Sequence, residues 1–152
     1  MATDENWSSY DRAVVDLAAP GRPLLRLVPD RPGAVGVWPD DADSPVIVVT
    51  AWNPDSELRP MDDNRMADMA LVAELDRRGL RHWPATGRDP EAHHHEDGVA
   101  VFGLTEAEGV AFGRRFGQAA VYVWTPEAWE IVSCTDGRRH VHGWRLVDDG
   151  TT

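Results

Sequence analysis

Residues 46–52 read VIVVTAW, an uninterrupted run of apolar and β-branched side chains. A run of this kind, without alternation between polar and apolar positions, is typical of a strand that is buried on both faces of a sheet. The chain has 152 residues, enough for one domain whose core holds such a strand without added cross-links. Residues 46–52 therefore predict a central strand, and the other elements are predicted around it.

Two helices and four more strands are predicted after this run. The first helix has acids in its first turn and Arg77 and Arg78 in its last, which complement the helix dipole, and Gly79 ends it. The second helix opens with a capping box of Thr105 and Glu108. The predicted helices cover residues 62–79 and 105–117, and the predicted strands cover residues 80–87, 98–103, 118–124 and 129–135.

This order of elements predicts an α+β fold with a ferredoxin-like core. The order is β-α-β-β-α-β-β, and its first six elements match the split βαβ arrangement, an antiparallel sheet with two helices on one face. The last strand is then an extra C-terminal strand; the alternative is another α+β layer to which an N-terminal strand is added. Residues 1–45 are predicted to be an N-terminal arm and linker with a short helix at 7–18 and a strand at 24–28. Residues 46–147 are predicted as the core domain, and residues 148–152 as a disordered tail.

Polar residues are predicted to gather at one end of this sheet. If the central strand runs upward, Asn53 lies at its top, where the first helix also begins and carries Asn64. The first helix then leads the chain down, the second strand leads it up, the third strand leads it down, and the second helix leads it up again. The connections before the third strand and after the second helix therefore lie at the top, like the one after the central strand. The residues expected at this end are Asn53, Asn64, Gly87, Asp89, Glu96 and Gln118.

Several short motifs in the same region resemble the bacterial domain-of-unknown-function family 3293. They are TAWNP, an asparagine at the following helix start, a Gly-x-Asp pattern with a later glutamate, and FGRRFGQAAV at residues 112–121. The combination is specific although each motif alone is weak, and it spans roughly residues 46–125. The positions that match the family pattern are Asn53, Pro54, Asn64, Glu96 and Gln118. The resemblance implies no particular activity, and the histidines that precede Glu96 do not belong to the pattern.

We predict a ligand site from these residues together with nearby arginines. Asparagine is also favoured at turns and helix starts, so the alternative for Asn53 and Asn64 is that they satisfy backbone groups. Glu96 is the candidate catalytic residue, because burial before a strand would raise its pKa and suit a general acid or base. An ion pair with Arg65 is the alternative for Glu96, and Arg88 is a further candidate charge. The predicted ligand-binding residues are Asn53, Pro54, Asn64, Arg65, Glu96 and Gln118.

Histidines, cysteine and tryptophans give weaker predictions. A two-histidine, one-carboxylate metal site could come from His93, His94, His95 and Glu96 together with His140 and His142, but the favoured interpretation is surface histidines. No metal and no cofactor are therefore expected. Cys134 has no adjacent base and is predicted to be an inert buried thiol. Trp124 is predicted to lie in the core, and Trp52 and Trp83 in the core or in the wall of a pocket.

Charge and composition limit the function classes. The net charge is −11, which disfavours binding to nucleic-acid phosphates. A single cysteine, an acidic start and no long apolar run predict a cytoplasmic protein that does not enter the membrane. Three functions stay open: binding of a small polar ligand or peptide at the polar end of the sheet, an enzyme such as a hydrolase or lyase that uses Glu96, and an acidic protein-interaction or inhibitor module.

Overall fold

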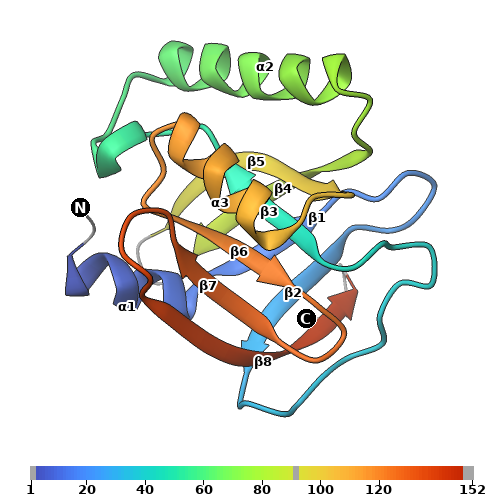
Figure 1. Cartoon of the computed structure of the whole chain (residues 1–152). Helices are drawn as coiled ribbons and strands as arrows, with labels where there is room; N and C mark the ends of the chain where they lie inside the picture. Colours follow the sequence, from blue (N-terminus) through green and yellow to red (C-terminus); the bar gives the residue numbers. More distant parts are fainter. Residues whose placement is uncertain (1–2, 91–92, 149–152) are drawn as a thin grey trace.

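The computed structural model describes residues 3–90 and 93–148 and forms a closed barrel of eight antiparallel strands with three α-helices (Figure 1). Around the barrel the strands follow the order β1-β2-β8-β7-β6-β3-β5-β4, and β4 pairs again with β1. The strands are β1 (Val14–Leu17), β2 (Leu25–Asp30), β3 (Val46–Thr50), β4 (His82–Asp89), β5 (His94–Phe102), β6 (Ala120–Trp124), β7 (Trp129–Ser133) and β8 (Arg139–Asp148). The helices are α1 (Asp4–Arg12), α2 (Met61–Arg77) and α3 (Glu106–Arg115), and a short 3₁₀ turn, η1, covers Pro54–Ser56.

The ferredoxin-like prediction is wrong because three strands that are not among its β-α-β-β-α-β-β elements, β1, β2 and β8, close the sheet. β1 pairs with β4, with Val15 opposite Gly87, and β8 pairs with both β7 and β2. The predicted N-terminal helix ends at Arg12, and the residues that follow it form β1 instead. Closure gives the edges of β4 and β7 hydrogen-bonding partners, whereas an open sheet would leave two edges unpaired.

Large aromatic side chains fill one part of the barrel interior. Trp83, Trp124, Trp129 and Trp144 are each at most 2% exposed and belong to one buried cluster. The rings of Trp124 and Trp144 meet edge to face at 5.2 Å, a favourable geometry for aromatic pairs. The Trp144 indole N–H also donates to the Thr125 carbonyl at 3.0 Å, which ties β8 to the β6–β7 turn.

Helices α2 and α3 cover the outside of β3 and its neighbours, where a second buried cluster lies (Figure 1). Alternate residues of β3 belong to the two clusters. Val46 and Val48 face the barrel interior, while Ile47 and Val49 face the helices. α3 approaches closely because it presents glycine, and a Cβ at Gly109 would lie 2.8 Å from Ile47. This double burial explains the continuous apolar run at residues 46–52.

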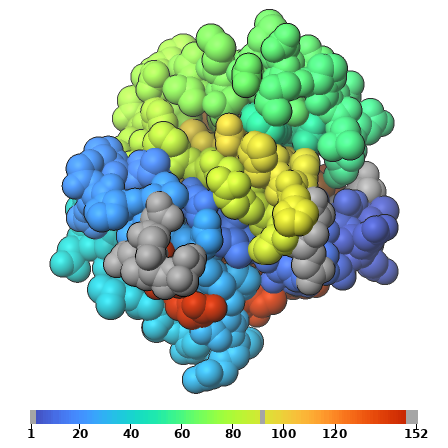
Figure 2. Space-filling view, turned by 180° about the vertical axis from the view of Figure 1, so that it is seen from behind, coloured from blue at the N-terminus to red at the C-terminus, as the bar shows by residue number. Residues whose placement is uncertain are grey.

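The outer shape of the molecule follows from this layering. Seen from behind, α2 forms one pole and the segment that follows β2 lies at the opposite pole, with the β4–β5 strands exposed between them (Figure 2). No helix in the part of the chain that the structure describes is long and apolar enough to cross a membrane. Of the predicted tail, residues 149–152 lie outside the described residues, and β8 extends to Asp148.

Gly98 offers a test of the barrel register at the β3–β5 pair. A Cβ there would collide with the Val49 carbonyl oxygen and lie 3.0 Å from the Thr50 Cα, both of which are backbone atoms that cannot move aside easily. Gly98→Ala is therefore expected to lower the free energy of unfolding by about 1–3 kcal/mol, measured by denaturant titration.

Gly87 on β4 is the matched control for Gly98. The atom nearest to a Cβ at Gly87 is the Glu96 carbonyl oxygen, at an ordinary 4.0 Å. Gly87→Ala should therefore change the free energy of unfolding by no more than about 0.5 kcal/mol. An equal loss in the free energy of unfolding for the two variants would contradict the β3–β5 register, in which Gly98 lies opposite Thr50.

Candidate functional site

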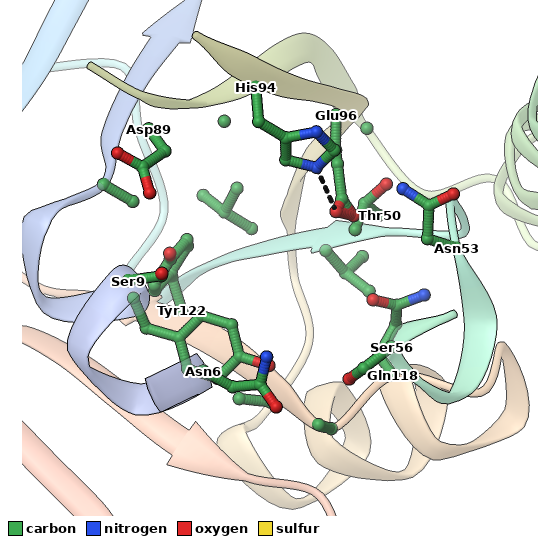
Figure 3. A pocket seen from close by; sticks show the side chains of 18 of the residues that line it. Asn6, Ser9, Thr50, Asn53, Ser56, Asp89, His94, Glu96, Gln118 and Tyr122 are labelled. Carbon is green, nitrogen blue, oxygen red and sulfur yellow. Dashed lines mark hydrogen bonds and ion pairs between the residues drawn. The ribbon is translucent and has the colours of Figure 1, made fainter. Parts of the chain in front are cut away.

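A cavity of about 380 Å³ occupies the part of the barrel interior that the tryptophans do not fill. Inward positions here carry small residues, so the strands enclose space instead of packed side chains. Polar side chains from several elements surround this space (Figure 3). The small lining residues are Ala13, Ala85, Gly87, Gly98 and Ala120, and the polar ones include Asn6, Ser9, Tyr10, Thr50, Asn53, Ser56, Asp89, His94, Glu96, Gln118 and Tyr122.

Glu96 is the central ionisable group of this cavity. It projects from the inward face of β5, and 26% of its side chain is exposed. Burial raises the pKa of its carboxyl, while His94 and a side-chain hydrogen bond from Asn53 act in the opposite direction. The His94 Nε2 atom lies 3.4 Å from a Glu96 carboxyl oxygen. A carboxyl with a raised pKa, close to an imidazole, can exchange a proton with a bound molecule or serve as its counter-ion.

Asn53 is held in place by a reciprocal amide pair with Asn64. The Asn53 backbone N–H donates to the Asn64 side-chain oxygen at 2.9 Å, and the Asn64 amide donates back to the Asn53 side-chain oxygen at 3.0 Å. The Asn53 oxygen also accepts from the Arg59 N–H at 2.9 Å. Asn53 has a φ of 49°, a left-handed conformation that asparagine tolerates better than most residues. These bonds occupy its oxygen and leave its NH₂ group to face Glu96.

Gln118 is positioned by the turn that follows α3. Its side-chain NH₂ donates to the Trp52 carbonyl at 3.0 Å, and its oxygen side faces the cavity (Figure 3). Gly117, with φ of 74°, packs against Pro54, and the Gly117 carbonyl accepts from the Asp55 N–H at 2.8 Å. Pro54 therefore joins the loop after β3 to the turn after α3, although it does not itself line the cavity.

The structure brings most of the predicted polar end together, although the predicted fold was wrong. Asn53, Glu96 and Gln118 line one cavity, as do Gly87 and Asp89. Asn64 is 3% exposed and does not line the cavity, but it holds Asn53 through hydrogen bonds. The role of these residues in binding stays a prediction.

The two candidate arginines differ in their position relative to the cavity, and Arg65 does not pair with Glu96. Arg65 is exposed on α2 and does not line the cavity, and the described contacts of Glu96 are with His94 and Asn53. Arg88 does line the cavity, but its Nε–H donates to Asp16 at 2.7 Å. The ion pair between Glu96 and Arg65 is therefore not formed.

Several lining residues were missed by the sequence reasoning. Tyr122 lies on the inward face of β6, and the alternation of this strand with Ala120 and Trp124 could have placed it there. Burial raises the pKa of the Tyr122 hydroxyl. Asn6, Ser9 and Tyr10 come from α1, and no local signal indicated that the N-terminal helix would form a wall of the cavity.

The family comparison covers the centre of this arrangement. Residues 49–121 match the family model described as "Protein of unknown function (DUF3293)". These residues belong to the DUF3293 family. The resemblance noticed in the sequence motifs is thereby confirmed, and the matched segment contains Asn53, Asn64, Glu96 and Gln118. Comparison with curated proteins gives no match, and comparison with solved structures gives none either.

The strands that close the barrel lie mostly outside the DUF3293 segment. β1 and β2 precede residue 49, and β7 and β8 follow residue 121. The lining residues from α1 also lie outside it. The cavity is thus lined mainly by the DUF3293 segment, together with residues of α1, Ala13 and Val48 before it and Tyr122 directly after it.

The histidines considered for a metal site do not all lie in one place. His94 faces the cavity, whereas His140 and His142 on β8 both hydrogen-bond to Asp11 of α1 at 2.8 Å. Within residues 3–90 and 93–148, no group of three His, Cys, Asp or Glu side chains has an arrangement that could hold a metal ion. His140 and His142 instead attach α1 to the barrel.

Trp52, Trp83 and Cys134 pack in the protein interior and do not line the cavity. Trp83 packs inside the barrel, and Trp52 is buried with its ring 5.5 Å from that of His95. Cys134 is buried outside the barrel under the helices, and burial raises its pKa to about 11. Such a thiol stays protonated near neutral pH and is a poor nucleophile.

Removal of the Asn64 side chain tests whether the amide pair supports the cavity. Asn64→Ala leaves the buried Asn53 N–H without its acceptor, and we expect a loss of about 1–3 kcal/mol in the free energy of unfolding. Arg65→Ala is the control on the same helix, because Arg65 is exposed and should change stability by less than about 0.5 kcal/mol. A loss for Arg65→Ala that equals that of Asn64→Ala would contradict the assigned support.

The raised pKa of Glu96 predicts a pH-dependent gain in stability on neutralisation. Ionised Glu96 is less stable in the cavity than in the unfolded chain, so its cost develops as pH rises above the ordinary glutamate range. Glu96→Gln should therefore unfold at higher denaturant concentration than the wild type at neutral pH. The difference should vanish below pH ~4, where both states protonate Glu96. A variant less stable than the wild type at neutral pH would exclude this explanation.

Proposed function

We propose that the protein binds a small polar ligand in the barrel cavity. A volume of about 380 Å³ lies in the lower part of the range for small-molecule sites. The single observation that carries the proposal is that one part of the barrel interior is packed with tryptophan, whereas the other part is left open around the half-buried carboxyl group of Glu96. An interior serving stability alone would be filled with apolar side chains throughout.

The polar groups of the wall support recognition of a polar molecule. Glu96, the Gln118 oxygen and the Tyr122 hydroxyl converge on the same space from three different strands and turns (Figure 3). Hydrogen bonds to other protein groups hold Glu96 and Gln118, and stacking on Trp129 holds Tyr122, so the three groups are oriented before a ligand arrives. Preorganised groups of this kind bind with a smaller entropic cost than mobile ones.

A fragment screen by NMR tests this proposal. A library of small polar fragments is titrated into ¹⁵N-labelled protein, and we expect shifts concentrated at the amides of Thr50, Gly98 and Ala120. Gly87→Leu should abolish these shifts because a Cβ at Gly87 fits without a clash, its nearest neighbour being the Glu96 carbonyl oxygen at 4.0 Å, and the longer side chain then enters the cavity.

The control for this blocking variant is Thr86→Leu on the same strand. Thr86 does not line the cavity, and its hydroxyl donates to the Asp97 carboxylate outside it. The control should retain binding. Fragments that shift no cavity amide in the wild type, or shifts that persist in Gly87→Leu, would refute the proposal.

A further inference from the structure

Four hydrogen-bond donors in the cavity wall, on Gln118, Thr50, Asn53 and Arg88, are already engaged by other protein groups. The Gln118 NH₂ group donates to backbone carbonyls, and the Thr50 hydroxyl donates to the Asp97 carbonyl at 2.6 Å. The Asn53 side chain hydrogen-bonds to Glu96, and the Arg88 Nε–H donates to Asp16. These groups therefore have limited capacity to donate to a ligand.

Hydrogen-bond acceptors, in contrast, face the open space. Within residues 3–90 and 93–148, the Gln118 side-chain oxygen and the Tyr122 hydroxyl oxygen accept no hydrogen bond from another residue, and both lie at the cavity. The Glu96 carboxylate accepts from Asn53 and contacts His94, which leaves further acceptor capacity on its two oxygens. A molecule that complements these three acceptors brings its own N–H donors.

The charges around the cavity favour the same class of molecule. Glu96 and Asp89 both line it, and Asp89 lies 3.8 Å from Arg12 at the rim. The guanidinium of Arg88 is paired with Asp16, a buried carboxylate that also binds Arg26. An anion would approach two carboxylates here, whereas a cation would gain attraction from Glu96 in a poorly solvated site.

The tyrosine of β6 adds an aromatic surface. One face of the Tyr122 ring stacks on Trp129, with centroids 4.7 Å apart, and the residue lines the cavity. Aromatic rings attract cations through their negative faces, and protonated nitrogen groups often bind between such rings and a carboxylate.

From these observations we propose that the cavity selects ligands that carry a cationic N–H group, such as a protonated amine, amidine or guanidinium, with Glu96 as the counter-ion. This inference rests on the proposed function and specifies the ligand class for the same site. The same arrangement disfavours phosphate-bearing and carboxylate-bearing molecules, because they would approach Glu96 and Asp89.

Three probes of nearly equal size and shape but different charge test whether charge determines the affinity for the cavity. Benzamidine is a cation, benzamide is its neutral analogue, and benzoate is the anion. Affinities are measured by ¹⁵N NMR titration at low salt, with the amides of Gly98 and Ala120 as reporters of the cavity. Benzamidine is expected to bind at least tenfold more tightly than benzamide, and benzoate more weakly than either.

Two matched variants identify the counter-ion. Glu96→Gln should weaken benzamidine binding at least tenfold and leave benzamide binding nearly unchanged. Asp97→Asn removes the same amount of charge from the neighbouring residue, which is exposed and does not line the cavity, and should weaken benzamidine binding less than twofold. This comparison distinguishes a local counter-ion from a general effect of the acidic surface.

The pH dependence gives an independent readout. Burial raises the pKa of Glu96, and only the ionised form attracts the cation, so benzamidine affinity should rise with pH through the titration of that carboxyl and then level off. Amidines stay protonated throughout this range. The titratable and charged groups that surround Glu96 are His94 and His95 of β5, Arg88 and Asp89 of β4, Tyr10 of α1 and Tyr122 of β6.

The possible outcomes separate this inference from the proposed function. If benzamide or benzoate shifts the cavity amides at concentrations as low as benzamidine does, the cavity binds ligands but the cationic preference is wrong. An unchanged benzamidine affinity in Glu96→Gln also overturns the inference. If neither these probes nor the fragment library shifts any cavity amide, the proposed function fails together with the inference.

Discussion

Closure of the eight-stranded sheet is the constraint on which the rest of the structure depends. A closed barrel of this strand number has an interior of nearly fixed width, so side-chain size at inward positions decides whether it is solid or hollow. Tryptophan and phenylalanine fill one part of this barrel, and alanine and glycine leave the other part open around Glu96. The packed part supplies apolar burial, and some of the same strands line the cavity.

The cavity wall shows how polar groups can be held in a protein interior. Asn53 and Asn64 satisfy one another and the backbone, so that the loop after β3 keeps a left-handed conformation beside Glu96. Glu96 is the exception, because its ionised form is less stable there than in water. A group that costs stability and faces open space is typical of functional sites, where stability and activity are in conflict.

Local sequence signals predicted most elements of the central region but not their closure. The helices expected at 62–79 and 105–117 correspond to α2 and α3, because caps, glycine stops and dipole-complementing charges act within a few residues. The partners of β1 and β8 lie far away in the chain, and no local signal specifies such pairing. Part of the site was nevertheless predicted, because α2 and α3 return the chain to the same end in an open or a closed sheet, and this brings Asn53, Glu96 and Gln118 together.

The sequence by itself determined the double burial of β3, the positions of both covering helices and the family to which residues 49–121 belong. These properties arise from periodicity, capping and motif, all of which are local. Only the tertiary structure decided that the sheet closes, that α1 forms a wall of the cavity, and that Tyr122 faces Glu96 across it. The physical reason is that an enclosed space is created by strands distant in sequence, and its size depends on which inward side chains remain small.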